Sequence, residues 1–261
     1  MTGLQAFLLG LLQGLTEFLP VSSSGHLELG NHLLGMTGGD NLPFTFAVHA
    51  ATVLSTVVVF RKDIWQLISR GFTFRMNNET MYILKLMLSM VPVAIIGIFF
   101  SEEVESLFTG DLLVVGICLL VTASLMAFAH FYRGRPERQM GWPSSLIIGM
   151  AQAVAVLPGL SRSGTTIATG ILLGVNRREV ARFSFLMVLV PVLGAAGIDL
   201  FSGDLSNDSC VGASSMVIGF LTAFISGLLS CSWMIRIVSK GKLIYFSLYC
   251  LTVGLIAIFA A

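Results

Sequence analysis

Two short segments of this 261-residue chain carry the residues that could do chemistry, and both interrupt apolar stretches. The first, 13–26, reads QGLTEFLPVSSSGH, and the second, 152–165, reads QAVAVLPGLSRSGT. Together they supply a carboxylate (Glu17), several serine hydroxyls, an imidazole (His26) and an arginine (Arg162). A carboxylate, a hydroxyl and an imidazole are the usual groups of acid–base and nucleophilic catalysis. An arginine suits phosphate because its planar fork can donate two parallel hydrogen bonds.

The first segment places its polar residues so that they can meet. Gln13 and Glu17 are four residues apart, which puts them on one face of a helix. Pro20 is expected to end that helix, residues 22–25 to form a turn, and His26 to begin a second helix. Glu17, the serines and His26 are therefore expected to converge on one pocket.

The second segment holds Arg162, which is costly in an apolar setting and by default functional. The guanidinium needs an anion, which is either Glu17 or a bound phosphate. An ion pair that only pins the two segments together is the structural alternative. Ser161 and Ser163 add hydroxyls, and a helix resuming near Gly164 would present free N–H groups to an anion.

The two segments belong to an internal repeat. Sliding the chain by 139 residues aligns 10–46 with 149–185 without gaps and gives 10 identities in 37 positions. A duplicated, Gly/Pro-interrupted segment in a hydrophobic chain indicates a site built between two halves. We predict a single domain over 1–261 with pseudo-repeat halves of about 1–131 and 140–261.

Composition indicates a polytopic membrane protein. Hydrophobic residues make up 55% of the chain, charged residues 11%, and the mean hydropathy is +0.89. A soluble globule would carry about twice that share of charge. The net charge is +1 and no basic arm is present, so no nucleic-acid partner is expected. The four cysteines have no metal-ligand spacing.

The hydrophobic pattern predicts six spans and two shorter, broken segments. A span needs enough apolar residues to cross about 30 Å of hydrocarbon, and six segments qualify: 43–60, 81–100, 112–131, 182–200, 211–235 and 243–260. Segments 3–35 and 144–175 are broken at Pro20 and at Pro158-Gly159, so we expect re-entrant helix–break–helix hairpins. The predicted fold is all-α, with six transmembrane helices and two re-entrant hairpins in an inverted-topology repeat.

Charge sets the expected orientation. Four predicted loops on one side hold 13 of the 15 basic residues, which assigns that side to the cytoplasm: 61–80, 132–143, 177–182 and 236–242. The opposite loops, 101–111 and 203–210, are acidic. Both termini are then predicted outside. Three spans separate the hairpins, so the two copies have opposite topology and meet near the midplane.

The motifs resemble those of the bacitracin-resistance family of undecaprenyl-diphosphatases. The family's (E/Q)xxxE motif with a serine-rich turn and GH corresponds to 13–26, and its PGxSRSxxT motif corresponds to 158–166. The resemblance implies hydrolysis of undecaprenyl diphosphate to the monophosphate at the outer face of the bacterial cytoplasmic membrane, which recycles the carrier for cell-wall synthesis. It also implies a divalent cation, Mg²⁺ or Ca²⁺, with Glu17 and Gln13 as predicted ligands. Many members carry Glu where this chain has Gln13.

On this reading the predicted catalytic residues are Glu17, Ser23, His26 and Arg162. Ser23 is the expected attacking hydroxyl or a close phosphate ligand, and His26 the proton shuttle. A histidine nucleophile or a metal-bound water would fit the same residues. The predicted phosphate-binding residues are Ser22, Ser24, Gly25, Ser161, Ser163, Gly164, Thr165 and Thr166. His49 either lines the pocket, which we favour, or bonds a backbone carbonyl.

The expected partners are a polyprenyl diphosphate substrate and membrane lipid. The oligomeric state stays open, with a homodimer as one alternative. A second class of function is an inverted-repeat transporter or flippase for a lipid phosphate or anion. A carrier would need Arg162 to bind its anion, but it would not need Glu17, Ser23 and His26 together.

Overall fold

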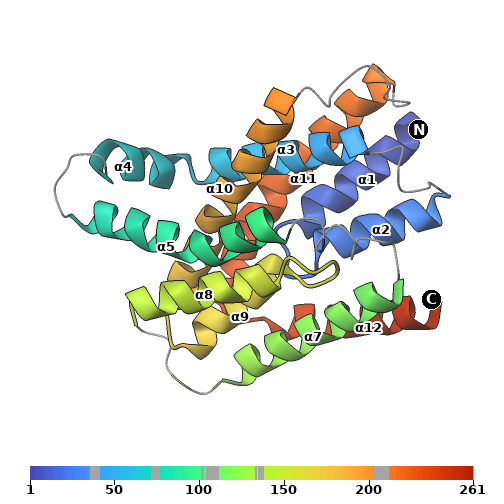
Figure 1. The fold of residues 1–261 in the computed structure, drawn as a ribbon. Coiled ribbons are helices and arrows are strands. Elements are labelled where there is room, and N and C mark those ends of the chain that lie inside the picture. The colour runs from blue at the N-terminus through green and yellow to red at the C-terminus, as the bar shows by residue number, and fades with distance from the viewer. Residues whose placement is uncertain are drawn as a thin grey trace.

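The described residues of the computed structural model form eleven helices and no strand (Figure 1). The description covers residues 1–35, 42–71, 77–100, 103, 112–132, 134, 138–202 and 212–260. The helices are α1 (Gly3–Thr16), α2 (Ser23–Leu33), α3 (Leu42–Val59), α4 (Arg61–Gly71), α5 (Asn78–Phe99), α7 (Leu112–Phe131), α8 (Trp142–Val154), α9 (Arg162–Leu172), α10 (Arg177–Ser202), α11 (Ala213–Ser239) and α12 (Ile244–Ala260). The predicted all-helical class is confirmed for this part of the chain.

Each of the six predicted spans coincides with one helix: α3, α5, α7, α10, α11 and α12. By length and composition, α5, α7 and α11 can each cross a membrane alone. Helices α3 and α4, which are bent by 71° relative to each other, would make a fourth span if the two together form one broken span. Helix α12 is apolar but shorter. The count of six spans therefore stays a prediction.

Residues 61–80, predicted to be a loop, contain a helix instead. Helix α4 occupies Arg61–Gly71, and its apolar side, with Leu67 buried, packs on the core. The charged residues on its outer side are typical of a loop, so the amphipathic helix was not predicted from the sequence. Asn77 then begins α5, because its side chain accepts a hydrogen bond from the Thr80 N–H at 2.7 Å.

The helix–break–helix of the first predicted hairpin is present, but its break lies earlier in the sequence than expected. Helix α1 ends at Thr16, before Pro20, and α2 begins at Ser23 rather than at His26. The prediction that 22–25 is a turn is therefore wrong except for Ser22. Ser22 is the N-cap, with φ of 68°, and its hydroxyl accepts a hydrogen bond from the Gly25 N–H at 3.4 Å.

The second hairpin breaks between α8 and α9. Ser161 is the N-cap of α9, and its hydroxyl accepts from the Gly164 N–H at 3.1 Å. Gly159 lies in the break with φ of +85°, a conformation that favours glycine. A Cβ on Gly159 would also lie 2.7 Å from the backbone oxygen of Val115 on α7. This turn therefore requires glycine for both its conformation and its packing.

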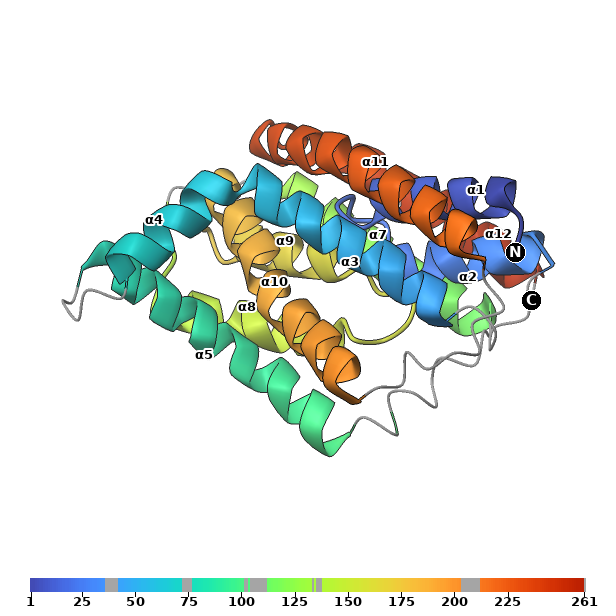
Figure 2. The ribbon, with the colours of Figure 1, turned by 90° about the horizontal axis from the view of Figure 1, so that it is seen from above.

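Equivalent glycines of the repeat make equivalent helix contacts. Gly10 of α1 lies against α11, and a Cβ there would overlap the backbone oxygen of Gly219. Gly149 of α8, its counterpart 139 residues later, lies against α5, where a Cβ would overlap the backbone oxygen of Ser89. Figures 1 and 2 show α1 beside α11 and α8 beside α5. Close backbone approach therefore joins each hairpin to a long helix of the other half.

The described parts of all four basic loops gather at one end of the bundle, where Gly241 of the fourth loop lies against the Arg177 side chain. Arg182 pairs with Asp63 at 2.7 Å, and the Asn176 N–H donates to the Arg138 backbone oxygen at 2.9 Å. Both ends of the described chain lie at the other end of the bundle, away from α4 (Figures 1 and 2). Of the acidic loops, residues 101–102, 104–111 and 203–210 lie outside the described part.

The outer faces of the long helices are apolar. Ile98 of α5 is 73% exposed, and Phe128 of α7 and Leu229 of α11 are each 68% exposed. Large apolar side chains exposed to this degree on several helices are expected where lipid covers the surface. Several buried polar residues lie at the two hairpin breaks, among them Ser22, Ser23, Ser161 and Ser163.

Candidate active site

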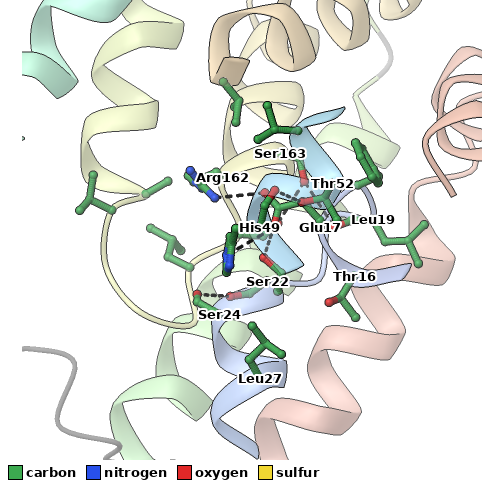
Figure 3. Close-up of a pocket in the computed structure, with 18 of the residues that line it drawn as sticks. Thr16, Glu17, Leu19, Ser22, Ser24, Leu27, His49, Thr52, Arg162 and Ser163 are labelled. Carbon is green, nitrogen blue, oxygen red and sulfur yellow. Dashed lines mark hydrogen bonds and ion pairs between the residues drawn. The ribbon is translucent and has the colours of Figure 1, made fainter. Parts of the chain in front are cut away.

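A cavity of about 770 Å³ lies where the two hairpin breaks meet α3, α5 and α10 (Figure 3). Its polar lining comes chiefly from the two predicted segments and from α3: Glu17, Ser22, Ser23, Ser24, His49, Thr52, Gln152, Ser161, Arg162 and Ser163. The rest of its wall is largely apolar and includes Val93, Val156, Leu157, Leu160, Phe185, Val188 and Leu189. The two motifs, separated by 139 residues in sequence, thus form one amphipathic cavity.

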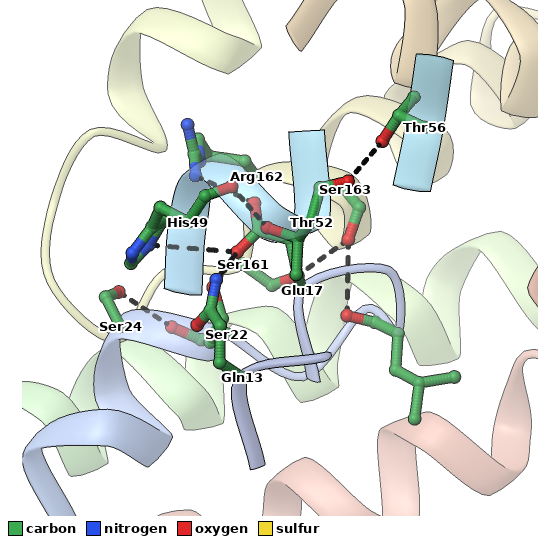
Figure 4. A network of polar contacts seen from close by, with 12 residues as sticks. Gln13, Glu17, Ser22, Ser24, His49, Thr52, Thr56, Ser161, Arg162 and Ser163 are labelled. Carbon is green, nitrogen blue, oxygen red and sulfur yellow. Dashed lines mark hydrogen bonds and ion pairs between the residues drawn. The ribbon is translucent and has the colours of Figure 1, made fainter. Parts of the chain in front are cut away.

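Glu17 is the centre of the polar network (Figure 4). Its Oε1 accepts from Arg162 Nη2 at 3.1 Å, and its Oε2 accepts from Gln13 Nε2 at 2.9 Å. The expected helical face shared by Gln13 and Glu17 is confirmed, and so is a Glu17–Arg162 pair between the hairpins. The Glu17 side chain is 13% exposed and that of Arg162 is 34% exposed. A carboxylate this far from solvent depends on these donors for its charge.

Ser23 donates its hydroxyl to the same carboxylate. The Ser23 Oγ lies 2.5 Å from Glu17 Oε2, a distance typical of a charge-assisted O–H···O⁻ bond. Ser23 is the first residue of α2, so the capping of α2 by Ser22 fixes the position of its hydroxyl. The hydroxyl and the group that could accept its proton are therefore already in contact.

Four of the predicted phosphate ligands line the cavity in two symmetric pairs. Ser22 and Ser24 have hydroxyl oxygens 3.3 Å apart, and Ser161 and Ser163 have theirs 3.4 Å apart. The repeat register superposes the first pair on the second. Each hairpin thus presents the same two hydroxyls near the first turn of its second helix.

The other four predicted phosphate ligands do not line the cavity. The Gly25 and Gly164 N–H groups are bound by the serine caps of their own helices. Thr166 Oγ1 donates within the helix and lies 2.6 Å from the Ser184 hydroxyl. Thr165 is buried away from the cavity. Because the helices begin earlier than expected, these residues fall on the packed side of α2 or α9.

His26 also departs from the prediction. Its Nδ1 donates to the Ser22 backbone oxygen at 2.8 Å, so its Nε2 accepts from the Tyr249 hydroxyl at 2.8 Å. The rings of His26 and Tyr249 stack with centroids 5.5 Å apart. His26 does not line the cavity, and the expectation that it meets Glu17 and Ser23 there is wrong. The Nδ1 bond stays within the start of α2, and the Nε2 bond joins α2 to α12.

His49 supplies the imidazole of the cavity. Its Nδ1 donates to the Thr45 backbone oxygen at 2.9 Å, which leaves Nε2 as the free ring nitrogen. That nitrogen lies 3.9 Å from Glu17 Oε2 and faces the cavity (Figures 3 and 4). Both roles considered for His49 from the sequence are therefore present. Its place on α3 was visible in the sequence, whereas its nearness to Glu17 was not.

The residues fit a hard divalent cation that shares its ligands with a substrate. No group of three or more His, Cys, Asp or Glu side chains gathers in the described part of the chain. The oxygen set is nevertheless suitable, because Gln13 Oε1 is buried beside Glu17 without a hydrogen-bond partner in that same part. Mg²⁺ and Ca²⁺ take carboxylate and amide oxygens together with water and phosphate oxygens. Glu17 lines the cavity and would hold such an ion, and the buried Gln13 oxygen beside it, which does not line the cavity wall, would be the second ligand.

Comparison with known proteins agrees with this geometry. The protein family described as "Bacitracin resistance protein BacA" matches residues 6–256. The chain belongs to the BacA family. This BacA-family protein is 51% identical over 261 residues to a protein of Bacteroides thetaiotaomicron named undecaprenyl-diphosphatase, covering 99% of this chain and 98% of that one.

Two further relatives carry related names. A Parabacteroides distasonis protein, also named undecaprenyl-diphosphatase, is 50% identical over 262 residues, covering 99% of this chain and 98% of its own. A Bacillus cereus protein named undecaprenyl-diphosphatase 1 is 35% identical over 264 residues, covering 98% and 96%. The resemblance read from the two motifs therefore extends over nearly the whole of this BacA-family chain.

Proposed function

We propose that this protein hydrolyses undecaprenyl diphosphate to undecaprenyl phosphate and inorganic phosphate. The names of its BacA-family relatives support the substrate. The observation that carries the reaction is the contact of the Ser23 hydroxyl with Glu17 inside a cavity that also holds Arg162. A nucleophile, a base and an anion-binding group thus share one site.

The amphipathic cavity suits an amphipathic substrate. The diphosphate would lie at the polar end, against Arg162 and the serine hydroxyls. The first isoprene units would follow the apolar wall, which includes Val93, Phe185 and Leu189, and the remaining chain would lie in the bilayer. Arg162 uses one hydrogen bond on Glu17, so its other donors are available to phosphate oxygens.

The residues support attack by Ser23. Glu17 takes the hydroxyl proton as Ser23 Oγ forms a bond to the terminal phosphorus. The bond from that phosphorus to the bridging oxygen breaks, and undecaprenyl phosphate leaves with the electron pair. Water then attacks the phosphoserine, which frees phosphate and restores the serine hydroxyl. Arg162 neutralises the charge that develops on the phosphoryl oxygens.

Other polar groups of the site position Glu17, the residue that takes the proton from Ser23. Gln13 holds the Glu17 carboxylate by the bond to Oε2, and His49 lies near the same oxygen. A protonated His49 would stabilise the carboxylate or return a proton to the leaving phosphate. A divalent cation held by Glu17 and Gln13 would supply further charge neutralisation at the diphosphate.

We infer that α1–α2 and α8–α9 are re-entrant hairpins among six spanning helices of the bacterial cytoplasmic membrane. The end that holds the basic loops would face the cytoplasm, and the end that holds both termini would face outward. With the cavity open to the outer face, the enzyme would recycle the lipid carrier of cell-wall synthesis.

The test is release of phosphate from undecaprenyl diphosphate by detergent-purified protein, with Mg²⁺ or Ca²⁺ and after chelation. We expect release that depends on the cation and is lost in Glu17→Ala and in Arg162→Ala. Glu79→Ala is the matched control, because Glu79 pairs with Arg70 at 3.7 Å at the edge of the bundle.

Release that persists in both site variants would contradict the proposed site. A folded wild-type protein that releases no phosphate would contradict the proposed activity. The inverted-repeat transporter would then become the better account, since a carrier needs Arg162 but not the Ser23–Glu17 contact.

A further inference from the structure

The repeat contains two equivalent glutamines, and the one that lines the cavity lacks the partner that the other one has. Gln13 and Gln152 superpose in the 139-residue register. Gln13 donates to Glu17, four residues later on the same helical face. The residue four positions after Gln152 is Val156, which superposes on Glu17 but has no polar group. The contact that holds the first amide is therefore missing from the second half.

Gln152 is buried and unpaired. It is 1% exposed, and neither its Oε1 nor its Nε2 has a hydrogen-bond partner in the described part of the chain. The great majority of buried polar side-chain atoms in proteins are hydrogen-bonded, so two unpaired atoms on one side chain need an explanation. A leucine of similar size would avoid the loss of solvation entirely. The amide is thus a poor choice for packing alone.

The surroundings of Gln152 point to a ligand as the missing partner. The side chain lines the same cavity as Arg162 and Glu17. The neighbouring lining from the second half is apolar and includes Val156, Leu157 and Leu160. An amide offers two N–H donors and one oxygen acceptor. A diphosphate offers acceptors in excess, so the donor side of the amide matches it.

We propose that Gln152 is a substrate-binding residue whose Nε2 donates a hydrogen bond to a non-bridging oxygen of the diphosphate. Its Oε1 then accepts a hydrogen bond from water that accompanies the anion. This inference rests on the proposed phosphatase function, which supplies the ligand. Gln152 acts in binding rather than in proton transfer, because the reacting phosphoryl group is held by Ser23, Glu17 and Arg162.

The test compares Gln152→Leu, which removes both polar atoms, with Gln152→Glu, which replaces the donor by a charged acceptor. KM and kcat for phosphate release are measured, together with the Tm with and without farnesyl methylenediphosphonate, an analogue that cannot be hydrolysed. Loss of one hydrogen bond to a charged ligand corresponds to about a 10- to 100-fold change in binding. We expect KM to rise by that factor in Gln152→Leu, and further in Gln152→Glu, with kcat within a few-fold of wild type.

The ligand-free Tm separates binding from structure. Gln152→Leu should keep or raise that Tm and should lose most of the Tm increase that the analogue produces. Ser145→Ala is the control in the same helix, because the Ser145 hydroxyl donates to the Trp142 backbone oxygen of that helix and does not line the cavity. If Gln152→Leu does not fold, Gln152→Asn takes its place. That variant keeps the amide but withdraws it by one methylene, so the same increase in KM is expected if Gln152 binds the diphosphate.

Several results would overturn the inference. Wild-type KM and a wild-type analogue effect in the Leu variant, or in the Asn variant where that one decides, would remove Gln152 from binding. A folded Gln152→Leu with a ligand-free Tm lowered by many degrees would make the amide structural. Activity of Gln152→Glu at or above wild type would make position 152 a cation ligand instead. If wild-type protein releases no phosphate, the proposed function fails, while the analogue Tm series still tests Gln152.

Discussion

Replacing Arg162 by methionine tests whether the charge pair between the hairpins holds the cavity together. At the observed 3.1 Å, two unit charges interact by about 1 kcal/mol in water and about 5 kcal/mol at an effective dielectric constant of 20. A third of the Arg162 side chain is exposed, so solvent screening moves the net value toward the lower figure. We expect a coupling free energy of about 1–2 kcal/mol between Glu17 and Arg162.

The two single substitutions should not destabilise the protein equally. Arg162→Met leaves a buried carboxylate with only Gln13 and Ser23 as donors, whereas Glu17→Gln leaves a guanidinium that water can reach. The arginine variant should therefore lose more stability, with Tm lowered by about 2–8 °C.

The assay is a double-mutant cycle on thermal unfolding in detergent, with Glu17→Gln, Arg162→Met and the double variant. We expect the double variant to be more stable than the sum of the single losses implies. Strict additivity would refute the reasoning, because it would mean that the pair contributes no coupling. A glutamate variant that loses more than the arginine variant would refute the assignment of the buried charge.

Two further predictions follow from packing and from His26. Gly149→Ala should destabilise the protein by about 1–3 kcal/mol, because its Cβ would overlap the Ser89 backbone. Gly97→Ala, with open space around the new Cβ, should be neutral or slightly stabilising. Thermal unfolding measures both variants, and equal losses of stability would contradict the close contact between α8 and α5. Tyr249→Phe removes the hydroxyl group that donates to His26 Nε2, so it should lower the stability by about 1 kcal/mol and leave kcat within a few-fold of wild type. A folded variant without phosphatase activity would indicate that His26 takes part in catalysis.

Much of the site could be predicted because it breaks a strong pattern. Polar residues inside apolar stretches stand out in a chain with 11% charged residues, and the repeat drew attention to the two interruptions. The i, i+4 spacing of Gln13 and Glu17 and the need of Arg162 for an anion are local arguments, and both contacts are present. The ion pair uses one hydrogen bond of Arg162, which is compatible with the proposed phosphate site.

The helix starts were harder to predict because serine serves two purposes. A serine tract is typical of a turn, yet serine is also a preferred N-cap and is tolerated in the first helical turn. Ser22 takes the cap, so α2 begins at Ser23 and its later residues rotate relative to the expected positions. That shift moves Gly25 from the expected turn, and His26 from the expected first position of the helix, to the packed side of the helix.

Side-chain partners from distant elements could not be predicted from a single chain. His26 is bound by Tyr249, 223 residues later, and no local pattern indicates that pair. His49 was recognised as a lining candidate, but its nearness to Glu17 depends on how α3 docks on the first hairpin. Gln152 was visible as an identity of the repeat, whereas its lack of a partner appears only in the folded cavity.

The most direct test of the central claim is to look for phosphate on Ser23. Wild-type protein, Ser23→Ala and the Glu79→Ala control are mixed with undecaprenyl diphosphate in a single turnover, quenched with denaturant at neutral pH so that phosphoserine and phosphohistidine both survive, digested and analysed by mass spectrometry. The account predicts a transient phosphoserine at Ser23 in wild type and in Glu79→Ala, and neither phosphoserine nor phosphate release in Ser23→Ala. Phosphate release at the wild-type rate by Ser23→Ala would contradict it, as would a phosphorylated histidine in place of phosphoserine.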